Sequence, residues 1–130
     1  MYLSGVGQTN QFYGMPDLGF IGLNDVVQNA AAIRDVVDLP LIVDADTGFG
    51  NALNVRHTVR NLERAGANAI QLEDRVMLKK CGHLSGKALI SLDEMVGKVK
   101  AAVDARHSTD FLIIARTDAS STRRRRHPQW

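Results

Sequence analysis

The sequence predicts a parallel α/β fold, in which short buried strands alternate with amphipathic helices. Three apolar runs, at 41–46, 69–74 and 111–115, have the length and composition of strands buried in a parallel sheet. Between these runs, apolar residues recur at helical spacing. Charged residues follow each run at its carboxyl end, where parallel α/β enzymes place their chemistry. This pattern fits either a barrel or a doubly wound sheet.

The N-terminal residues predict a short strand over 1–5. Residues 8–22 are rich in Gly, Asn and Gln and are expected to form a loop that carries Asp17. A first helix is expected over 25–37, with Asn24 as its N-cap.

A second helix is expected over 55–65. Asn54 is its expected N-cap, and Gly66 is expected to end it. A third helix begins at a capping box, in which Glu94 follows Ser91 by three residues. The side chains expected to face the sheet are Val26, Ala30, Ile33 and Val37 in the first helix, Val55, Val59 and Leu62 in the second, and Met95, Val99, Ala102 and Val103 in the third.

Composition excludes several classes of protein. The 130 residues are enough for one domain, and 45% of them are hydrophobic. The sequence has no apolar run long enough to cross a membrane and no N-terminal signal peptide. Its only cysteine, Cys81, cannot form an internal disulfide. We therefore expect a protein of the reducing cytoplasm, without a membrane partner.

The net charge of +2 comes from the C-terminal end. Four of the 16 basic residues are Arg123 to Arg126, and the rest of the chain is mildly acidic. Four arginines can bind phosphates or act as a nuclear address. No predicted fold supports such a role for residues 120–130, so nucleic acid is not an expected partner.

Asp44 and Asp46 lie two positions apart at the end of a predicted strand, so their side chains point to the same face. Two carboxylates at one point repel each other unless a cation or proton lies between them. Magnesium prefers such oxygen ligands. A solvated acidic turn or a pair of helix caps explains the same residues equally well.

The loop after the 69–74 strand carries Lys79, Lys80, Cys81, Gly82 and His83. Neighbouring cations lower the pKa of a thiol and favour the reactive thiolate. A buried structural cysteine is the ordinary alternative, but the flanking residues here are not apolar.

Arg116 ends the 111–115 strand. A guanidinium at that place can hold a carboxylate through two parallel hydrogen bonds. Its structural alternative is an ion pair with Asp118 or Asp74.

Four blocks of this sequence resemble the isocitrate lyase/phosphoenolpyruvate mutase superfamily. They occur in the order and near the spacing of that superfamily, over residues 1 to about 119. The closer likeness is to the branch of methylisocitrate lyase, 2,3-dimethylmalate lyase and oxaloacetate-cleaving enzymes. The blocks are Tyr2–Gly5 with Pro16–Gly19, Val43–Gly50, Glu73–Asp74 with Lys79–His83, and Ala115–Ala119.

The resemblance implies that residues 1–119 are part of a (β/α)8 TIM barrel, with about four parallel strands and the helices between them. Since this family begins with an earlier strand and helix, we expect such a unit to precede Met1. Residues 120–130 have no likeness to the family and are expected to be a disordered basic tail.

The resemblance also implies a Mg²⁺ site. Asp44 and Asp46 would bind the ion, Glu73 would help directly or through water, and Asp17 would lie nearby. Arg75 stands where the family usually has glutamine. It adds a positive charge beside Glu73 that could compete with the metal.

Catalytic roles follow from the same resemblance. Cys81 matches the acid that protonates the enolate-like product, and it favours carbon–carbon cleavage over phosphorus chemistry. Lys79 and His83 would tune the thiol or the departing carboxylate. Tyr2 matches a residue that could take the proton of the substrate's hydroxyl group.

Substrate-binding residues are implied at two places. Ser4, Gly5 and Val6 match a segment that holds a substrate carboxylate through a hydroxyl group and backbone N–H groups. Val6 stands where methylisocitrate lyases often have glycine. This replacement argues against the binding of a large tricarboxylate. The remaining substrate-binding residues implied are Cys81, Gly82 and Arg116.

The function implied is a Mg²⁺-dependent carbon–carbon lyase acting on a small 2-hydroxy or 2-oxo dicarboxylate or tricarboxylate. Because the family carries further substrate-binding groups on later strands, we expect this chain alone to be weakly active or inactive. A folded form is expected to be a homo-oligomer. The alternative is a non-catalytic fragment or interaction protein derived from the same family.

Overall fold

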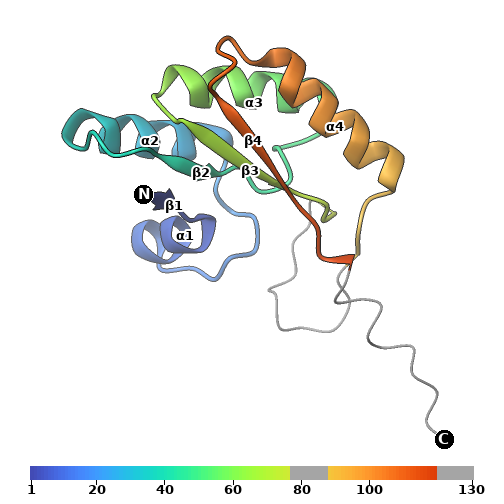
Figure 1. Ribbon diagram of the computed structural model, residues 1–130. Coiled ribbons are helices and arrows are strands. Elements are labelled where there is room, and N and C mark those ends of the chain that lie inside the picture. The colour runs from blue at the N-terminus through green and yellow to red at the C-terminus, as the bar shows by residue number, and fades with distance from the viewer. Residues whose placement is uncertain (77–87, 120–130) are drawn as a thin grey trace, which may run out of the picture.

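The computed structural model describes residues 1–76 and 88–119, which form one parallel sheet with helices packed on it (Figure 1). The strands are β1 (Tyr2–Leu3), β2 (Ile42–Asp44), β3 (Ala69–Glu73) and β4 (Leu112–Arg116). The helices are α1 (Gly5–Tyr13), α2 (Leu23–Val36), α3 (Ala52–Arg64) and α4 (Leu92–Ala105).

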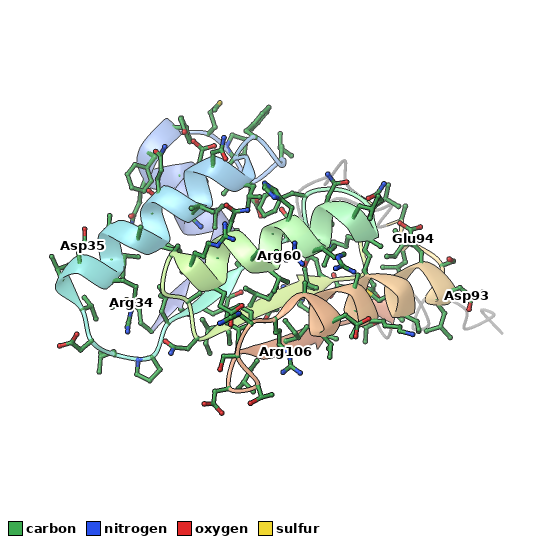
Figure 2. All side chains as sticks on the ribbon, turned by 90° about the horizontal axis from the view of Figure 1, so that it is seen from above. Arg34, Asp35, Arg60, Asp93, Glu94 and Arg106 are labelled. Atoms are coloured by element: carbon green, nitrogen blue, oxygen red, sulfur yellow. The ribbon has the colours of Figure 1, made fainter. Side chains whose placement is uncertain are left out.

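The sheet order is β1-β2-β3-β4, and all neighbouring strands are parallel. Helices α2, α3 and α4 lie on the same face of the sheet (Figure 1), and they lie side by side when seen from above (Figure 2). A doubly wound sheet would reverse its strand order and carry helices on both faces. The arrangement is therefore that of consecutive units of a (β/α)8 barrel, as expected from the resemblance.

The hydrophobic core lies between the sheet and these three helices. Burial alternates along β2, because Leu41, Val43 and Ala45 are buried while Ile42 and Asp44 are only partly covered. A strand covered on both faces was expected here, and in the described residues only the helix-facing side is fully covered. The predicted inward side chains Val55, Val59 and Leu62 of α3 are completely buried, as are Val26 and Ala30 of α2.

The expected loop over 8–22 is wrong in its first part, which is helix α1. Ser4 caps this helix, since its hydroxyl oxygen accepts a hydrogen bond from the Gly7 N–H at 3.4 Å. The helix ends at Gly14, whose φ of 61° suits glycine. Buried Gln8 accepts a hydrogen bond from Asn29 of α2 at 2.9 Å. Contacts between helices thus outweigh the weak helix propensity of this polar, glycine-rich segment.

Two predicted caps are displaced toward the N-terminus. The N-cap of α2 is Gly22 instead of Asn24, and the Asp25 carboxylate accepts a hydrogen bond from the Gly22 N–H at 2.9 Å. The N-cap of α3 is Asn51, and Asn54 is the reciprocal partner that accepts from the Asn51 N–H at 3.0 Å. Each helix begins three residues before its first buried apolar side chain, which is Val26 in α2 and Val55 in α3.

Helix α4 begins at Ser91 as predicted, and the Ser91 hydroxyl accepts a hydrogen bond from the Glu94 N–H at 3.1 Å. The predicted inward position of Val103 is wrong, since this side chain is 40% exposed. The buried positions of α4 are Lys98, Ala102 and Ala105. In the described residues, no helix is both long and apolar enough to cross a membrane.

Candidate functional site

Asp44 and Asp46 lie where β2 ends, beside the start of α1. The Asp44 carboxylate accepts one hydrogen bond from the Gly5 N–H at 3.3 Å and another from the Asp46 N–H at 3.1 Å. A Cβ atom on Gly5 would lie 3.3 Å from the Asp44 Oδ2 atom, so glycine permits this close approach. Asp46 has a φ of 51°, a conformation that aspartate adopts more readily than most residues.

Glu73 lies next to Asp46 across the sheet. The register pairs Asp44 with Gln71, and the Glu73 N–H continues this ladder by donating to the Asp46 carbonyl oxygen at 2.9 Å. Glu73 is 3% exposed, and its Oε2 atom lies 3.5 Å from the Arg116 Nη1 atom. The parallel pairing therefore brings together carboxylates that are far apart in the sequence.

Tyr2 and Arg116 complete this cluster. Partial burial, followed by the charge of Asp44, raises the pKa of the Tyr2 phenol to about 12. Burial acts to lower the pKa of Arg116, but the carboxylates of Glu73 and Asp118 outweigh it and raise that pKa. At neutral pH the phenol is protonated and the guanidinium is charged.

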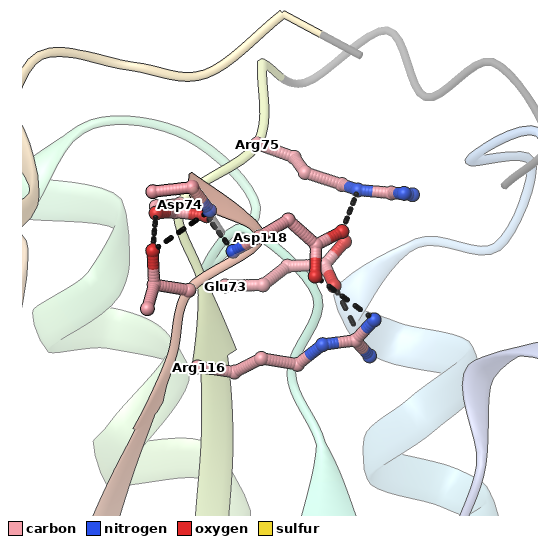
Figure 3. A network of polar contacts seen from close by, with 7 residues as sticks. Glu73, Asp74, Arg75, Arg116 and Asp118 are labelled. Atoms are coloured by element: carbon pink, nitrogen blue, oxygen red, sulfur yellow. Dashed lines mark hydrogen bonds and ion pairs between the residues drawn. The ribbon is translucent and has the colours of Figure 1, made fainter. Parts of the chain in front are cut away.

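A second network follows the ends of β3 and β4 (Figure 3). Arg75 Nε lies 2.9 Å from Asp118 Oδ2, and Arg116 Nη2 lies 3.4 Å from Asp118 Oδ1. The Asp74 carboxylate accepts hydrogen bonds from the Thr117 hydroxyl and, at 3.0 Å, from the Asp118 N–H. The ion pair expected as the structural alternative for Arg116 is present with Asp118, and a further one joins it to Glu73. Arg75 contacts Asp118 and not the carboxylates of the expected metal site.

Lys98 is a buried cation that sequence reasoning missed. Its side chain is 5% exposed, and its Nζ atom donates to the Thr47 carbonyl oxygen at 3.1 Å. Thr47 directly follows Asp46, so α4 holds the turn that carries this carboxylate. The signal was in the sequence, because Met95, Lys98 and Ala102 follow helical spacing.

The substrate-binding residues expected at the N-terminus lie beside Asp44. Ser4 caps α1, Gly5 is buried against Asp44, and Val6 is 45% exposed. Asp17 lies between α1 and α2, in the segment before Gly22. The remaining expected residues, Lys79, Cys81, Gly82 and His83, lie outside the described residues.

The carboxylates near Asp44 form an all-oxygen set, which suits magnesium. Within residues 1–76 and 88–119, no three acidic, histidine or cysteine side chains converge closely enough to enclose a metal ion. Mg²⁺ commonly uses one or two protein carboxylates and keeps several waters. Asp44, Asp46 and Glu73 therefore fit an ion held by one or two direct ligands with the rest acting through water. They do not form a closed cage of four carboxylates that includes Asp17.

A cleft of about 710 Å³ lies beside this cluster, between the N-terminal ends of α2 and α3. It is lined by Asp46, Thr47 and Phe49 from the turn after β2, and by His57 and Asn24 among others. Tyr2, Asp44, Glu73 and Arg116 do not line it. The charged cluster therefore lies outside this cleft, and Asp46 is the expected metal ligand that lines it.

Parallel strands that end in Asp44, Glu73 and Arg116, with helices on one face, are the arrangement of units of a (β/α)8 barrel, the class of fold in which enzymes place their sites at the strand ends. Residues 1–129 match the family model described as phosphoenolpyruvate phosphomutase. The chain is 53% identical over 123 residues to 2,3-dimethylmalate lyase of Eubacterium barkeri, covering 95% of this chain and 43% of that protein. It is 60% identical over 119 residues to 2-methylisocitrate lyase of Aeropyrum pernix, covering 92% of this chain and 38% of the relative.

Solved structures agree with these relatives. A crystal structure of 2,3-dimethylmalate lyase superposes with a TM-score of 0.86 at 41% identity, covering 93% of this chain and 41% of that one. A phosphonopyruvate hydrolase in complex with oxalate and Mg²⁺ superposes with a TM-score of 0.80 at 38% identity. The match covers 91% of this chain and 40% of the hydrolase chain. The chain belongs to the phosphoenolpyruvate mutase/isocitrate lyase family. It spans about two fifths of the length of the curated relatives that it matches.

Proposed function

We propose that this chain carries the metal-binding and carboxylate-binding part of a Mg²⁺-dependent carbon–carbon lyase. Its substrate would be a small 2-hydroxy or 2-oxo dicarboxylate or tricarboxylate, such as a substituted malate or a methylisocitrate-like acid. The observation that carries the proposal is the cluster of Tyr2, Asp44, Glu73 and Arg116, in which carboxylates and a guanidinium face one another. The names of the relatives support the substrate class.

Asp44, Asp46 and Glu73 would hold the magnesium ion, with Asp17 nearby. When bound, magnesium supplies Lewis-acid polarisation of the substrate's oxygen atoms. The Gly5 N–H and the Ser4 hydroxyl would bind one substrate carboxylate.

Arg116 would bind a substrate carboxylate and oppose the negative charge that develops on the departing fragment. Tyr2 would face the substrate's hydroxyl group as the residue that takes its proton. Because burial and the charge of Asp44 keep this phenol protonated at neutral pH, the phenol would have to lose its own proton before it could take one from the substrate. Cys81, assisted by Lys79 and His83, would protonate the departing fragment, and Gly82 would line the same substrate.

The test begins with metal binding, because it needs no turnover. A ligand present at a hundred times its dissociation constant stabilises the native state by about 2.7 kcal/mol. We expect millimolar Mg²⁺ to raise the thermal midpoint of the wild-type chain, and Asp44→Asn to abolish that rise. Asp93→Asn, at an exposed position of α4 (Figure 2), should keep the Mg²⁺ response and serves as the matched control.

Turnover is tested separately with 2,3-dimethylmalate and 2-methylisocitrate. Cleavage next to the hydroxyl carbon produces a 2-oxo acid, which a coupled dehydrogenase detects. We expect release of the 2-oxo acid to require Mg²⁺ and to be lost in Cys81→Ser. A Mg²⁺ response without turnover would restrict the proposal to binding. The absence of both would favour a non-catalytic interaction protein derived from this family.

A further inference from the structure

The turn after β2, residues 45–50, carries Asp46 and has an unusual backbone. Asp46 has a φ of 51° and Phe49 a φ of 60°, while Gly48 and Gly50 have φ values of 88° and 143°. The left-handed region is unfavourable for residues with a side chain, and it persists only where contacts with the surrounding structure enforce it. The conformation of Asp46 therefore depends on what holds this turn.

Backbone hydrogen bonds hold the first half of the turn. The Ala45 carbonyl oxygen accepts from the Gly48 N–H at 2.8 Å, which closes the turn. The Asp46 carbonyl oxygen accepts from the Glu73 N–H at 2.9 Å, which ties the turn to β3. The hydrogen bonds of the next two carbonyl groups are buried, and a buried carbonyl group needs a donor.

Two side chains from different helices hold the second half of the turn. Lys98 Nζ of α4 donates to the Thr47 carbonyl oxygen at 3.1 Å. The Thr58 hydroxyl of α3 donates to the Gly48 carbonyl oxygen at 3.0 Å. Thr58 is completely buried, and the Lys98 side chain is 5% exposed. Helices α3 and α4 thus fix the two peptide groups that directly follow the expected metal ligand.

Both donors act on Asp46 through the backbone. The ammonium group of Lys98 lies 3.7 Å from the carboxylate of Glu94, one turn earlier in α4 (Figure 2), and it donates to the turn. The hydroxyl group of Thr58 likewise donates to the turn. If either donor were lost, the turn would relax toward an ordinary backbone conformation with negative φ. The Asp46 side chain would then point in another direction.

We propose that Lys98 and Thr58 are positioning residues, which by holding the turn after β2 keep the Asp46 carboxylate in the conformation that binds Mg²⁺. This inference rests on the proposed function, in which Asp46 is a metal ligand. Groups that orient metal ligands without touching the ion typically change metal affinity by about 10- to 100-fold.

The experiment compares two substitutions that remove a donor and keep most of the side-chain shape, Lys98→Met and Thr58→Val. Thr58→Ser retains the hydroxyl group and is the conservative variant. Lys100→Met, at an exposed position of α4, is the matched lysine control. Leu62→Val lowers stability in the buried core, at the opposite end of α3 from the turn.

The first readout is Mg²⁺ affinity, measured by titration calorimetry at a temperature at which every variant is folded. We expect Lys98→Met and Thr58→Val each to weaken Mg²⁺ binding about tenfold. Thr58→Ser, Lys100→Met and Leu62→Val should bind Mg²⁺ as wild type does. A purely structural role would instead make Leu62→Val weaken binding as much as Lys98→Met.

The second readout needs no metal ion. In NMR spectra of the metal-free protein, the backbone chemical shifts of Asp46 and the coupling between its amide and α protons together report its φ angle. We expect the left-handed value in wild type and in Thr58→Ser. In Lys98→Met and Thr58→Val the signals should move toward those of an ordinary negative φ.

The outcomes separate this inference from the proposed function. Failure of wild type to bind Mg²⁺ would overturn the proposed function, while the Asp46 signals would still test the effect of the two donors on the turn. Wild-type Mg²⁺ affinity in both Lys98→Met and Thr58→Val would overturn the inference, as would Asp46 signals that are unchanged in both. Because the donors come from different helices, misfolding of one variant leaves the other to decide.

Discussion

The two faces of the sheet differ in what they do. On the face toward α2, α3 and α4, side chains such as Val43, Ile70 and Leu72 are almost completely buried. On the opposite face, Asp44 and Arg116 lie at the carboxyl ends of their strands. Alternation along each strand separates the two sets, since successive side chains point to opposite faces. One face thus stabilises the fold, while the other presents charged groups.

Stability should depend mainly on the helix-covered face. Leu72 of β3 is 1% exposed, whereas Leu112 of β4 is 58% exposed on the other side of the same sheet. We expect Leu72→Ala to lower the free energy of unfolding by about 2–5 kcal/mol, because it leaves a cavity. Leu112→Ala should cost less than about 1 kcal/mol. Urea unfolding measures both, and equal losses would contradict the division between the faces.

The helix-covered face of the sheet is mainly apolar, but it contains a buried charged side chain, Lys98 of α4. Lys98→Met keeps most of the apolar side chain but leaves the buried Thr47 carbonyl without its lysine donor. We expect a loss of about 1–3 kcal/mol in the free energy of unfolding, as for other buried polar groups that lose a partner. Lys100→Met, at an exposed position of the same helix, is the control. If the two variants were equally stable, the hydrogen bond to Thr47 would have no structural importance.

The smallest effect is expected at the start of α2. The Gly22 N–H, and next the Tyr13 hydroxyl, lower the pKa of Asp25 below its ordinary value of 3.8. Because the folded-state pKa is the lower one, this stabilisation is present above pH 3.8 and is lost as the pH falls through the folded-state pKa. Asp25 is exposed enough for solvent to screen it, so Asp25→Asn should cost at most about 0.5 kcal/mol at pH 7.

The measurement for Asp25 is thermal unfolding of wild type and Asp25→Asn across a series of acidic pH values. The difference between the two midpoints should shrink as Asp25 becomes protonated in wild type. Asp35→Asn, near the other end of α2 and away from the N-terminal cap, is the matched control (Figure 2). A difference for Asp25→Asn that is independent of pH would mean that the charge of Asp25 does not stabilise the cap.

Local patterns in the sequence were sufficient to predict much of this protein. The order of strands and helices, the Ser91 cap and the inward side chains of α3 follow from residue spacing, and each depends on neighbours within a few positions. Placement of Asp44 and Glu73 at strand ends follows in the same way. The barrel, as opposed to a doubly wound sheet, was predicted by the resemblance and agrees with the strand order.

Only the tertiary structure decided the contacts between distant segments. Arg75 and Asp118 are 43 residues apart, and Lys98 and Thr47 are 51 apart. Such pairs depend on the register of parallel strands and on the packing of α4 beside α3, which no local pattern encodes. Helix α1 was missed for a related reason, because its polar, glycine-rich sequence has weak propensity and gains stability from contacts such as Gln8 with Asn29.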